Sequence, residues 1–337
     1  MNSDHRMNDK MYILITILFI FQVEVCTPFL FEPQSSHGSL NFLAFGDWGG
    51  ISFHPYTTPV QTSVADQMAR VAAREKAEFV LALGDNFYLY GVESVDDPRF
   101  QTTFEAVYYN SSLHIPWYVV AGNHDYFGNV SAQIEYSKRS SRWKFPDFYH
   151  KLTQPIPGGR TLDILLIDTI QLCGNVYALD QPPVGPADLK AAEDQWKWIE
   201  RSLNESQADY ILVGGHYPIR SVAEHGPTDC LIQRLEPMLY QNSVSAYLAG
   251  HDHQLQHIQM STEGQTMDYF NVGAANFVDK SQAHLTSVPR ENLKFIFADL
   301  MYLGGFSYFE VSDSAMKVKF IDGVGFVRYE HEIKPRK

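Results

Sequence analysis

Five apolar runs in this chain end in the same way, and this regularity constrains the fold more than any other feature of the sequence. Each run has the composition of a buried β-strand, stops at glycine and then presents Asp, Asn or His. Binding sites in open α/β sheets form at the carboxyl ends of the strands. One Gly-Asp after a strand is ordinary turn chemistry, but five such ends predict a common site. The junctions are Phe45-Gly46-Asp47, Leu83-Gly84-Asp85, Ala121-Gly122-Asn123, Val213-Gly214-Gly215-His216 and Ala249-Gly250-His251.

The segments between these runs include helical patterns. Apolar residues recur at helical spacing in Thr62–Lys76 and in Ala187–Leu203. Alternation of strands with helices predicts an α/β sandwich whose helices cover the sheets. After about residue 267 the pattern changes to the in-out alternation of antiparallel strands, in Phe306–Val311 and Met316–Ile321. We expect this tail to complete a sheet of the same domain. The other strands are expected at Leu40–Phe45, Phe79–Leu83, Trp117–Ala121, Leu162–Ile167, Tyr210–Val213 and Ser245–Ala249.

The N-terminal segment is expected to be a secretory signal peptide. Arg6 and Lys10 precede the apolar block Met11–Val23, which is shorter than the about 20 residues that a membrane-spanning helix needs. We predict a signal peptide over residues 1–27 and a single domain over residues 28–337. A signal anchor is the alternative.

The cysteines favour the same secreted or lysosomal location. If Cys26 leaves with the signal, Cys173 and Cys230 are the remaining pair, and they are expected to form a disulfide in an oxidising compartment. On the chain-entropy model such a crosslink contributes about 4 kcal/mol. Three sequons, which begin at Asn110, Asn129 and Asn204, are possible glycosylation sites.

The charge of the chain excludes one broad class of partner. Its 337 residues are 45% hydrophobic, enough for a sizeable core, and carry a net charge of −13. A general nucleic-acid binder needs a basic surface. We therefore expect no nucleic acid as a partner, and no membrane once the signal is removed.

The polar residues at the strand ends are of the types that bind metal ions. They are too many for one ion and mix oxygen with nitrogen donors, which suits two metals about 3.5–4 Å apart. A closed structural zinc site would use four ligands, usually with cysteine, and no cysteine is placed at these ends. The alternative is that they are hydrogen-bonding turn residues. The candidate ligands are Asp47, Asp85, Tyr88, Asn123, His216, His251 and His253.

Five motifs give the chain a family resemblance. In order, they are Gly-Asp-Trp-Gly from residue 46, Gly-Asp-Asn-Phe-Tyr from 84, Gly-Asn-His-Asp from 122, Gly-Gly-His-Tyr-Pro from 214 and Gly-His-Asp-His from 250. This series resembles the metallophosphoesterases, in the form of the purple acid phosphatases of the small, mammalian-type branch. The resemblance runs from about residue 40 to 327. It implies a four-layer sandwich of two mixed sheets packed face to face, with helices outside.

The resemblance also implies a metal content and a reaction. Fe(III) would be held by Asp47, Asp85, Tyr88 and His253, and a second divalent metal, Fe(II) or Zn(II), by Asp85, Asn123, His216 and His251, with Asp85 and a hydroxide bridging. A trivalent ion can bind Tyr88 as phenolate, which implies a purple or pink colour. The implied activity is hydrolysis of phosphate monoesters, of small molecules or phosphoproteins, with metal-bound hydroxide as nucleophile.

Further roles are carried over from the same motifs. His124 stands in the general-acid position, with Asp125 beside it to orient it or raise its pKa. His225 matches a second histidine near the substrate, although a plain loop residue is an equal alternative. Family analogy places Trp48, Asn86 and Asn276 at the pocket. Asp252 is expected to turn away from the metals. The non-motif histidines at 37, 54, 114, 150, 257 and 284 are expected to be surface or structural residues.

Regulation by proteolysis is a hypothesis for this chain. In related enzymes the loop that corresponds to residues 174–190 covers the site, and proteolytic cutting of it raises activity. Here Gln181–Pro186 differs from the sequence of the mammalian enzymes. The alternative functions are a phosphodiesterase on the same metal core and a redox-active iron protein that generates reactive oxygen species. By analogy with the branch, we expect a monomer.

Overall fold

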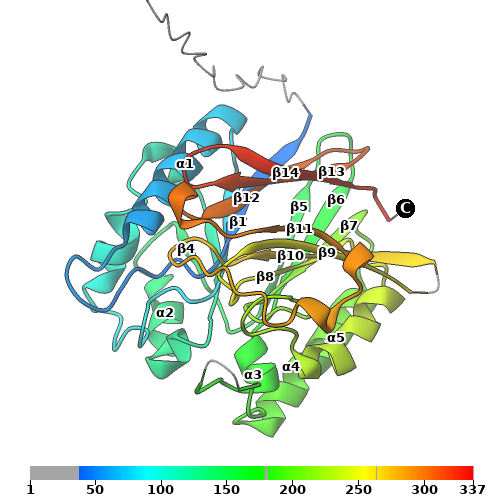
Figure 1. The fold of residues 1–337 in the computed structure, drawn as a ribbon, viewed down its shortest axis with the longest axis horizontal. Helices are drawn as coiled ribbons and strands as arrows, with labels where there is room; N and C mark the ends of the chain where they lie inside the picture. The colour runs from blue at the N-terminus through cyan, green and yellow to red at the C-terminus, as the bar shows by residue number, and fades with distance from the viewer. Residues whose placement is uncertain (1–37, 179–180, 263, 337) are drawn as a thin grey trace, which may run out of the picture. The chain divides into compact units, whose positions relative to one another are not determined.

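The strands and helices expected from the sequence recur in a computed structural model, which describes residues 38–178, 181–262 and 264–336. The predicted signal peptide, its cleavage site, Cys26 and His37 lie outside the described residues. The described residues form one compact unit. Within it two seven-stranded sheets carry the structure (Figure 1).

The first sheet combines the strands of the N-terminal half with the C-terminal tail. Its β1, β2, β3 and β4 are parallel, and β12 pairs antiparallel with β1. The expected tail therefore does complete a sheet of the same unit, as predicted. The strand order is β14 (Val327–Ile333), β13 (Met316–Asp322), β12 (Gly305–Val311), β1 (Leu40–Phe45), β2 (Phe79–Leu83), β3 (Trp117–Val120) and β4 (Trp143–Lys144).

The second sheet is also mixed. Its central strands β6, β7, β8 and β10 run parallel to one another, whereas β5, β9 and β11 pair antiparallel with their neighbours. The carboxyl ends of the parallel strands consequently lie at one edge. The order is β11 (Leu293–Phe297), β9 (Leu255–Thr262), β10 (Gln265–Val272), β8 (Ala246–Ala249), β7 (Tyr210–Gly214), β6 (Thr161–Leu166) and β5 (His150–Pro155).

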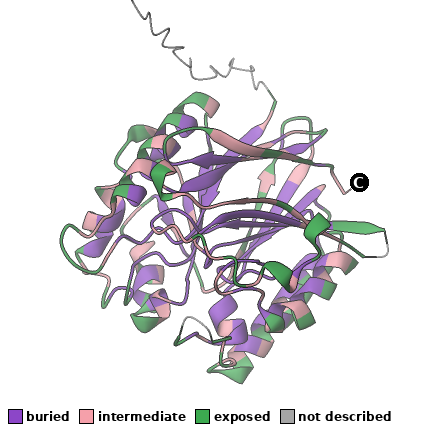
Figure 2. Cartoon of the chain, viewed as in Figure 1, coloured by how far each residue is buried: buried purple, intermediate pink, exposed green. Residues whose placement is uncertain are grey.

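Alternating side chains of each strand enter two different cores, and this produces the layers. In β1, Phe42 joins a core shared by both sheets, while Leu43 joins a core with helix α1 (Pro59–Glu75). Outward residues of β6, β7 and β8 pack with α4 (Leu189–Asn204) and α5 (Asp229–Gln241) in a third core. The central strands of both sheets are buried, whereas the edge strands β5, β11 and β14 and the outer helix faces are partly or fully exposed (Figure 2). The predicted sandwich of two mixed sheets with helices outside is confirmed.

Capping residues set the helix starts, which differ slightly from the predicted ones. Helix α1 begins at Pro59, three residues before the predicted start, because the Thr58 side chain accepts a hydrogen bond from the Gln61 amide at 3.0 Å. Helix α4 begins at Leu189, since Asp188 accepts from the amides of the first turn. Apolar periodicity identifies the buried face of a helix, whereas the cap fixes its first residue.

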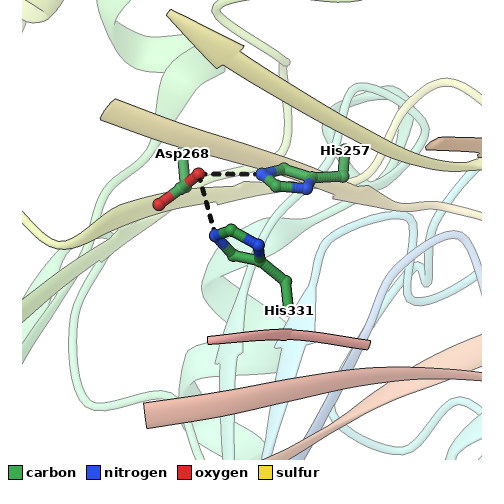
Figure 3. Close-up of side chains that lie close together, drawn as sticks. All are labelled: His257, Asp268 and His331. Carbon is green, nitrogen blue, oxygen red and sulfur yellow. Dashed lines mark hydrogen bonds and ion pairs between the residues drawn. The ribbon is translucent and has the colours of Figure 1, made fainter. Parts of the chain in front are cut away.

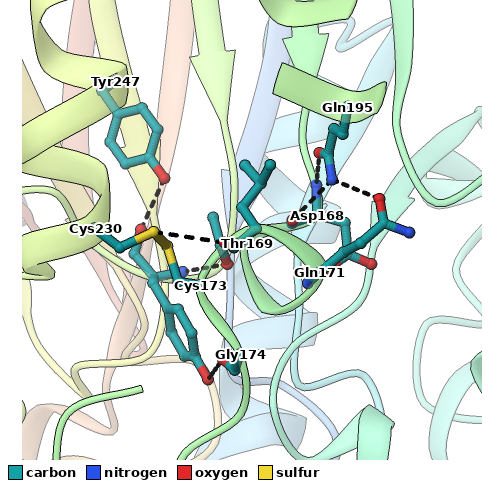
Figure 4. The surroundings of a disulfide bond; sticks show 10 residues. Asp168, Thr169, Gln171, Cys173, Gly174, Gln195, Cys230 and Tyr247 are labelled. Carbon is teal, nitrogen blue, oxygen red and sulfur yellow. Dashed lines mark hydrogen bonds between the residues drawn. A yellow bond between two sulfur atoms is a disulfide. The ribbon is translucent and has the colours of Figure 1, made fainter. Parts of the chain in front are cut away.

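The predicted disulfide between Cys173 and Cys230 is confirmed, with 5.8 Å between the Cα atoms. It joins the end of α3 (Thr169–Cys173) to α5 (Figure 4). Around it, Thr169 Oγ1 accepts from the Tyr217 amide at 3.0 Å, and the Tyr247 hydroxyl donates to the Tyr217 carbonyl at 2.7 Å. The loop that follows β7, next to His216, is thereby fixed from two sides.

The three possible glycosylation sites lie on the surface: the sequon asparagines Asn110, Asn129 and Asn204 are all exposed. Within the described residues, the helices are too short or too polar to cross a membrane. Helix α2 (Val130–Tyr136) was not predicted; Asn129 caps its N-terminus, and the Asn129 side chain accepts a hydrogen bond from the Ala132 amide.

Candidate metal centre

Glycine at the strand ends lets carboxylates approach the backbone more closely than any side chain would allow. A Cβ atom on Gly122 would lie 2.2 Å from Oδ1 of Asp85, and one on Gly250 would lie 2.4 Å from Oδ2 of Asp47. Such contacts are far inside van der Waals distance. At these two strand ends, glycine therefore has a steric cause: it makes room for the carboxylates of Asp85 and Asp47.

Asp47 follows β1 and connects three of the predicted residues. Its Oδ1 accepts a hydrogen bond from the Tyr88 hydroxyl at 2.9 Å and lies 3.5 Å from Nε2 of His253. Its Oδ2 accepts from the backbone amide of His251 at 2.7 Å. The Tyr88 hydroxyl is also 3.1 Å from Nε2 of His253. These residues come from both sheets and meet at one point.

Asp85 follows β2 and connects the others. Its Oδ1 lies 3.4 Å from Nε2 of His216, and that nitrogen lies 2.9 Å from Oδ1 of Asn123. The other ring nitrogen of His216 lies 2.9 Å from the carbonyl oxygen of Leu83. A backbone acceptor at Nδ1 orients the ring so that Nε2 faces the carboxylate, the arrangement common in metal-ligating histidines.

The remaining candidate ligand, His251, packs among other imidazoles. Its ring centroid lies 5.1 Å from that of His216 and 4.1 Å from that of His225, on which it stacks. Asp47, Asp85 and His251 all have positive φ angles, of 57°, 51° and 70°. Non-glycine residues in this region cost about 1–3 kcal/mol each and persist where the surroundings over-determine them, often at functional sites.

A cavity of about 200 Å³ opens over this cluster. Asp47, Tyr88 and His216 are fully buried, at 0%, 1% and 0% exposure. The other predicted ligands reach the cavity wall. The lining residues are Asp85, Asn123, His124, Phe127, Val176, Tyr177, Ala178, His225, His251 and His253.

The electrostatics of the cluster fit a bound cation. Burial raises the pKa of Asp47 well above its usual value, and burial and the neighbouring Asp47 raise that of Tyr88. Burial, together with the surrounding histidines, lowers the pKa of His251. Buried anions are costly unless a positive charge compensates them. Donor atoms of Asp47, Asp85 and His216 all lie within 4.8 Å of one another, so metal ions of the kind the motifs imply fit these residues.

The predicted role of Asp125 toward His124 is wrong. Both oxygens of the buried Asp125 carboxylate accept hydrogen bonds from other groups, the amides of Asn86, Phe87 and Gly122 and the Gln133 side chain. His124 instead places Nδ1 2.7 Å from the Leu89 carbonyl oxygen, and its amide donates to Asp85. Adjacent residues in a turn point in different directions, so sequence neighbourhood did not predict contact.

Asp252 contacts the cluster indirectly. Its Oδ1 accepts from the His225 amide at 2.9 Å, and its Oδ2 accepts from the Ser221 hydroxyl. The Asp252 carboxylate thus binds the backbone of the loop that carries His225. The imidazole ring of His225 stacks on that of His251. The two histidines expected to act on the substrate, His124 and His225, both line the cavity.

The three residues placed at the pocket by family analogy are not there. Trp48 is buried in an aromatic core and donates Nε1–H to Asn86 at 3.1 Å. Asn86 in turn donates to Gln133 at 3.0 Å. Asn276 accepts a hydrogen bond from the Thr58 hydroxyl at 2.6 Å, next to the start of α1. Each side chain satisfies a buried polar contact, which explains its residue type without a ligand.

Two aromatic residues at the cavity were not predicted. Phe127 and Tyr177 are 40% and 68% exposed, and their ring centroids lie 6.0 Å apart. Phe127 also contacts His124, at 5.8 Å between centroids. Phe127 ends the short 3-10 helix Asp125–Phe127 and Tyr177 lies in the loop after α3, and no local sequence pattern signals that they meet.

Comparison with known proteins agrees with this arrangement. A sequence model of the family described as calcineurin-like phosphoesterase matches residues 40–255, a range that contains every candidate ligand. The chain belongs to this family. Within it, the chain groups with acid phosphatases of the tartrate-resistant type.

Two of the matching relatives illustrate this similarity. Tartrate-resistant acid phosphatase type 5 of rabbit (Oryctolagus cuniculus) is 44% identical over 92% of this chain and 94% of its own length. The human (Homo sapiens) protein of the same name is 46% identical over 88% and 92%. Among solved structures, GAP50, the anchor in the inner membrane complex of Plasmodium, superposes with a TM-score of 0.75 at 23% identity over 89% of this chain and 90% of its own. That likeness concerns the fold alone.

Proposed function

We propose that this phosphoesterase is a secreted acid phosphatase that hydrolyses phosphate monoesters at a dinuclear Fe(III)–M(II) centre. The observation that carries the proposal is the convergence of Asp47, Asp85 and His216, from the ends of three strands in two sheets, within 4.8 Å. Relatives named acid phosphatases support the reaction class.

The donor set divides naturally between two ions. When bound, such a pair supplies Lewis acidity that neutralises charge on the phosphate and acidifies an attacking water. Because burial raises the pKa of Tyr88, a phenolate here needs a highly charged neighbour, which favours Fe(III). Fe(III) would be held by Asp47, Asp85, Tyr88 and His253, and Fe(II) or Zn(II) by Asp85, Asn123, His216 and His251.

The protein's own groups would handle the leaving group. With the Leu89 carbonyl accepting from Nδ1 of His124, the Nε2 side of the ring is left for the cavity that His124 lines. A protonated imidazole there would donate its proton to the departing alkoxide. His225, stacked on His251 at the same cavity, would bind the phosphate or share this proton transfer.

The disulfide supports a location in the secretory pathway, since such crosslinks persist in oxidising compartments. Secretion itself depends on residues 1–27 and is tested by sequencing the N-terminus of protein recovered from culture medium. A mature N-terminus near residue 28 is expected. Protein that stays in the cell with Met1 intact would contradict secretion without touching the enzymatic proposal.

The decisive experiment measures activity and metal together. Purified protein is assayed with an aryl phosphate at about pH 5, with and without tartrate, alongside metal analysis and a visible spectrum. We expect tartrate-resistant hydrolysis, iron in the protein and a visible absorption band. Hydrolysis of an aryl phosphodiester at a higher rate than the monoester would favour a phosphodiesterase, and colour without turnover would favour a redox protein.

A further inference from the structure

Two histidines and an aspartate far from the catalytic cavity face one another between the two sheets (Figure 3). His257 lies on β9 and Asp268 on β10, both in the second sheet, whereas His331 lies on β14, the edge strand of the first. Nε2 of His257 is 2.8 Å from Oδ1 of Asp268, and Nε2 of His331 is 3.3 Å from the same oxygen. The three donor atoms all lie within 4.8 Å of one another.

We propose that His257, Asp268 and His331 form a second metal site, for one divalent transition-metal ion of the zinc type. Two imidazoles and one carboxylate are a common donor set for such ions, with water as a further ligand. Bonds of about 2.0–2.1 Å place neighbouring ligand atoms about 3.3 Å apart around a tetrahedral ion. The observed separations of 2.8 and 3.3 Å need only small side-chain shifts to reach that spacing.

The neighbours of the cluster hold its donors in place. Nδ1 of His257 lies 2.8 Å from the Tyr329 hydroxyl oxygen, which can accept a hydrogen bond from Nδ1–H and leave the Nε2 lone pair toward Asp268. The His257 ring stacks on Phe270 with 4.4 Å between centroids. Gln259 donates to Oδ1 of Asp268 at 2.8 Å. Outer contacts of this kind orient the ligands in known metal sites.

The cluster is also accessible to an ion. His257 is fully buried, but the side chain of His331 is 22% exposed. Asp268 and His331 both line a cavity of about 500 Å³. An ion can therefore enter from the side of β14, and water can complete its coordination.

An ion bound by these three residues would stabilise the folded protein. Its ligands come from both sheets, so it would crosslink the edge strand β14 to β9 and β10. Metal binding to the folded state alone raises the free energy of unfolding. The site is separate from the catalytic residues, and its loss is not expected to change turnover.

The test compares zinc uptake by the holoenzyme with its active-site metals in place. After equilibrium dialysis against Zn²⁺ and metal analysis, we expect wild type and the exposed-histidine control His114→Gln to bind one more zinc per chain than His331→Gln. Zinc should also raise the Tm of wild type and the control, but not of His331→Gln. Phosphatase activity of His331→Gln should be unchanged, which verifies its fold. Equal zinc uptake by all three proteins, or no extra zinc in wild type, overturns the site.

Discussion

Tyr88 donates its hydroxyl to the Asp47 carboxylate across 2.9 Å, although the two residues follow different strands. Both are buried, and the pKa of each is raised by burial. In the proposed metal centre, a bound cation would take the place of the phenol proton. Metal binding would then be coupled to deprotonation of Tyr88, and a tyrosinate bound to iron would absorb visible light.

Tyr88→Phe should remove the visible absorption band of the iron-loaded protein. The substitution deletes one oxygen and preserves the ring contacts with His124 and Phe277, so the fold is expected to remain. Iron content should fall because one ligand is lost, and turnover should fall by at least about tenfold. Absorption spectroscopy with iron analysis measures both. A coloured Tyr88→Phe protein would refute the assignment of Tyr88 as a ligand.

His124→Gln should lower kcat by about 10²–10⁴-fold on substrates with poor leaving groups, because those alkoxides need a proton. The loss should be much smaller for a nitrophenolate, which departs unprotonated. Metal content should match wild type, since His124 lies beside the metal ligands but is not one of them in this proposal. A leaving-group series of kcat values checks the prediction. An equal loss across the series would mean that His124 acts on binding or structure instead.

Tyr177→Ala should weaken the binding of aryl phosphates but not that of alkyl phosphates. Tyr177 and Phe127 form an aromatic wall of the cavity, and aromatic pairs contribute about 0.5–1.5 kcal/mol, or roughly 2–10-fold in KM. An alkyl phosphate should show no such change. Tyr109→Ala removes a tyrosine of similar exposure, 67%, away from the cavity and serves as the control. Equal KM changes for aryl and alkyl substrates would contradict stacking.

His150→Leu should make the protein more resistant to acid. Burial lowers the pKa of His150 to about 4, against a smaller opposing effect of Asp147. Between that value and the unfolded pKa of about 6.5, the unfolded state binds more protons, so stability falls as the pH is lowered. The expected loss from His150 is about 2 kcal/mol between pH 8 and pH 5. Urea unfolding at both pH values measures it.

The control for this prediction is His114→Gln, which changes an exposed histidine. It should keep the wild-type difference in stability between the two pH values. If His150→Leu also keeps that difference, His150 is not a source of acid sensitivity.

Replacing both Cys173 and Cys230 with Ser should lower the free energy of unfolding by about 4 kcal/mol. The two residues are 57 positions apart, and the crosslink restricts the unfolded chain over that length. Denaturant unfolding of the double variant, compared with wild type with and without reductant, measures the loss. Reduced wild type should approach the variant, and a stability unaffected by reductant would show that the bond contributes little.

The sequence by itself determined the sandwich and the residues of the candidate metal centre. Strand composition, the glycine after each strand and the polar residue that follows are local features, and each has a local physical cause. Gly122 and Gly250, for example, leave space that Asp85 and Asp47 occupy. Because neighbouring parallel strands end at the same edge of a sheet, the local pattern also implied that Asp47 and Asp85 lie close together, whereas His216 joins them through the packing of the second sheet on the first.

Only the tertiary structure decided which neighbours each polar side chain has. Asp125 accepts from backbone amides instead of supporting His124, and Trp48 lies in an aromatic core. His257 meets Asp268 because β9 pairs with β10, and His331 joins them only because β14 belongs to the other sheet and packs against this one. Such contacts depend on the pairing and packing of distant strands, which no window of sequence contains. The direction of a side chain in a turn, and the partner across two sheets, are properties of the assembled fold.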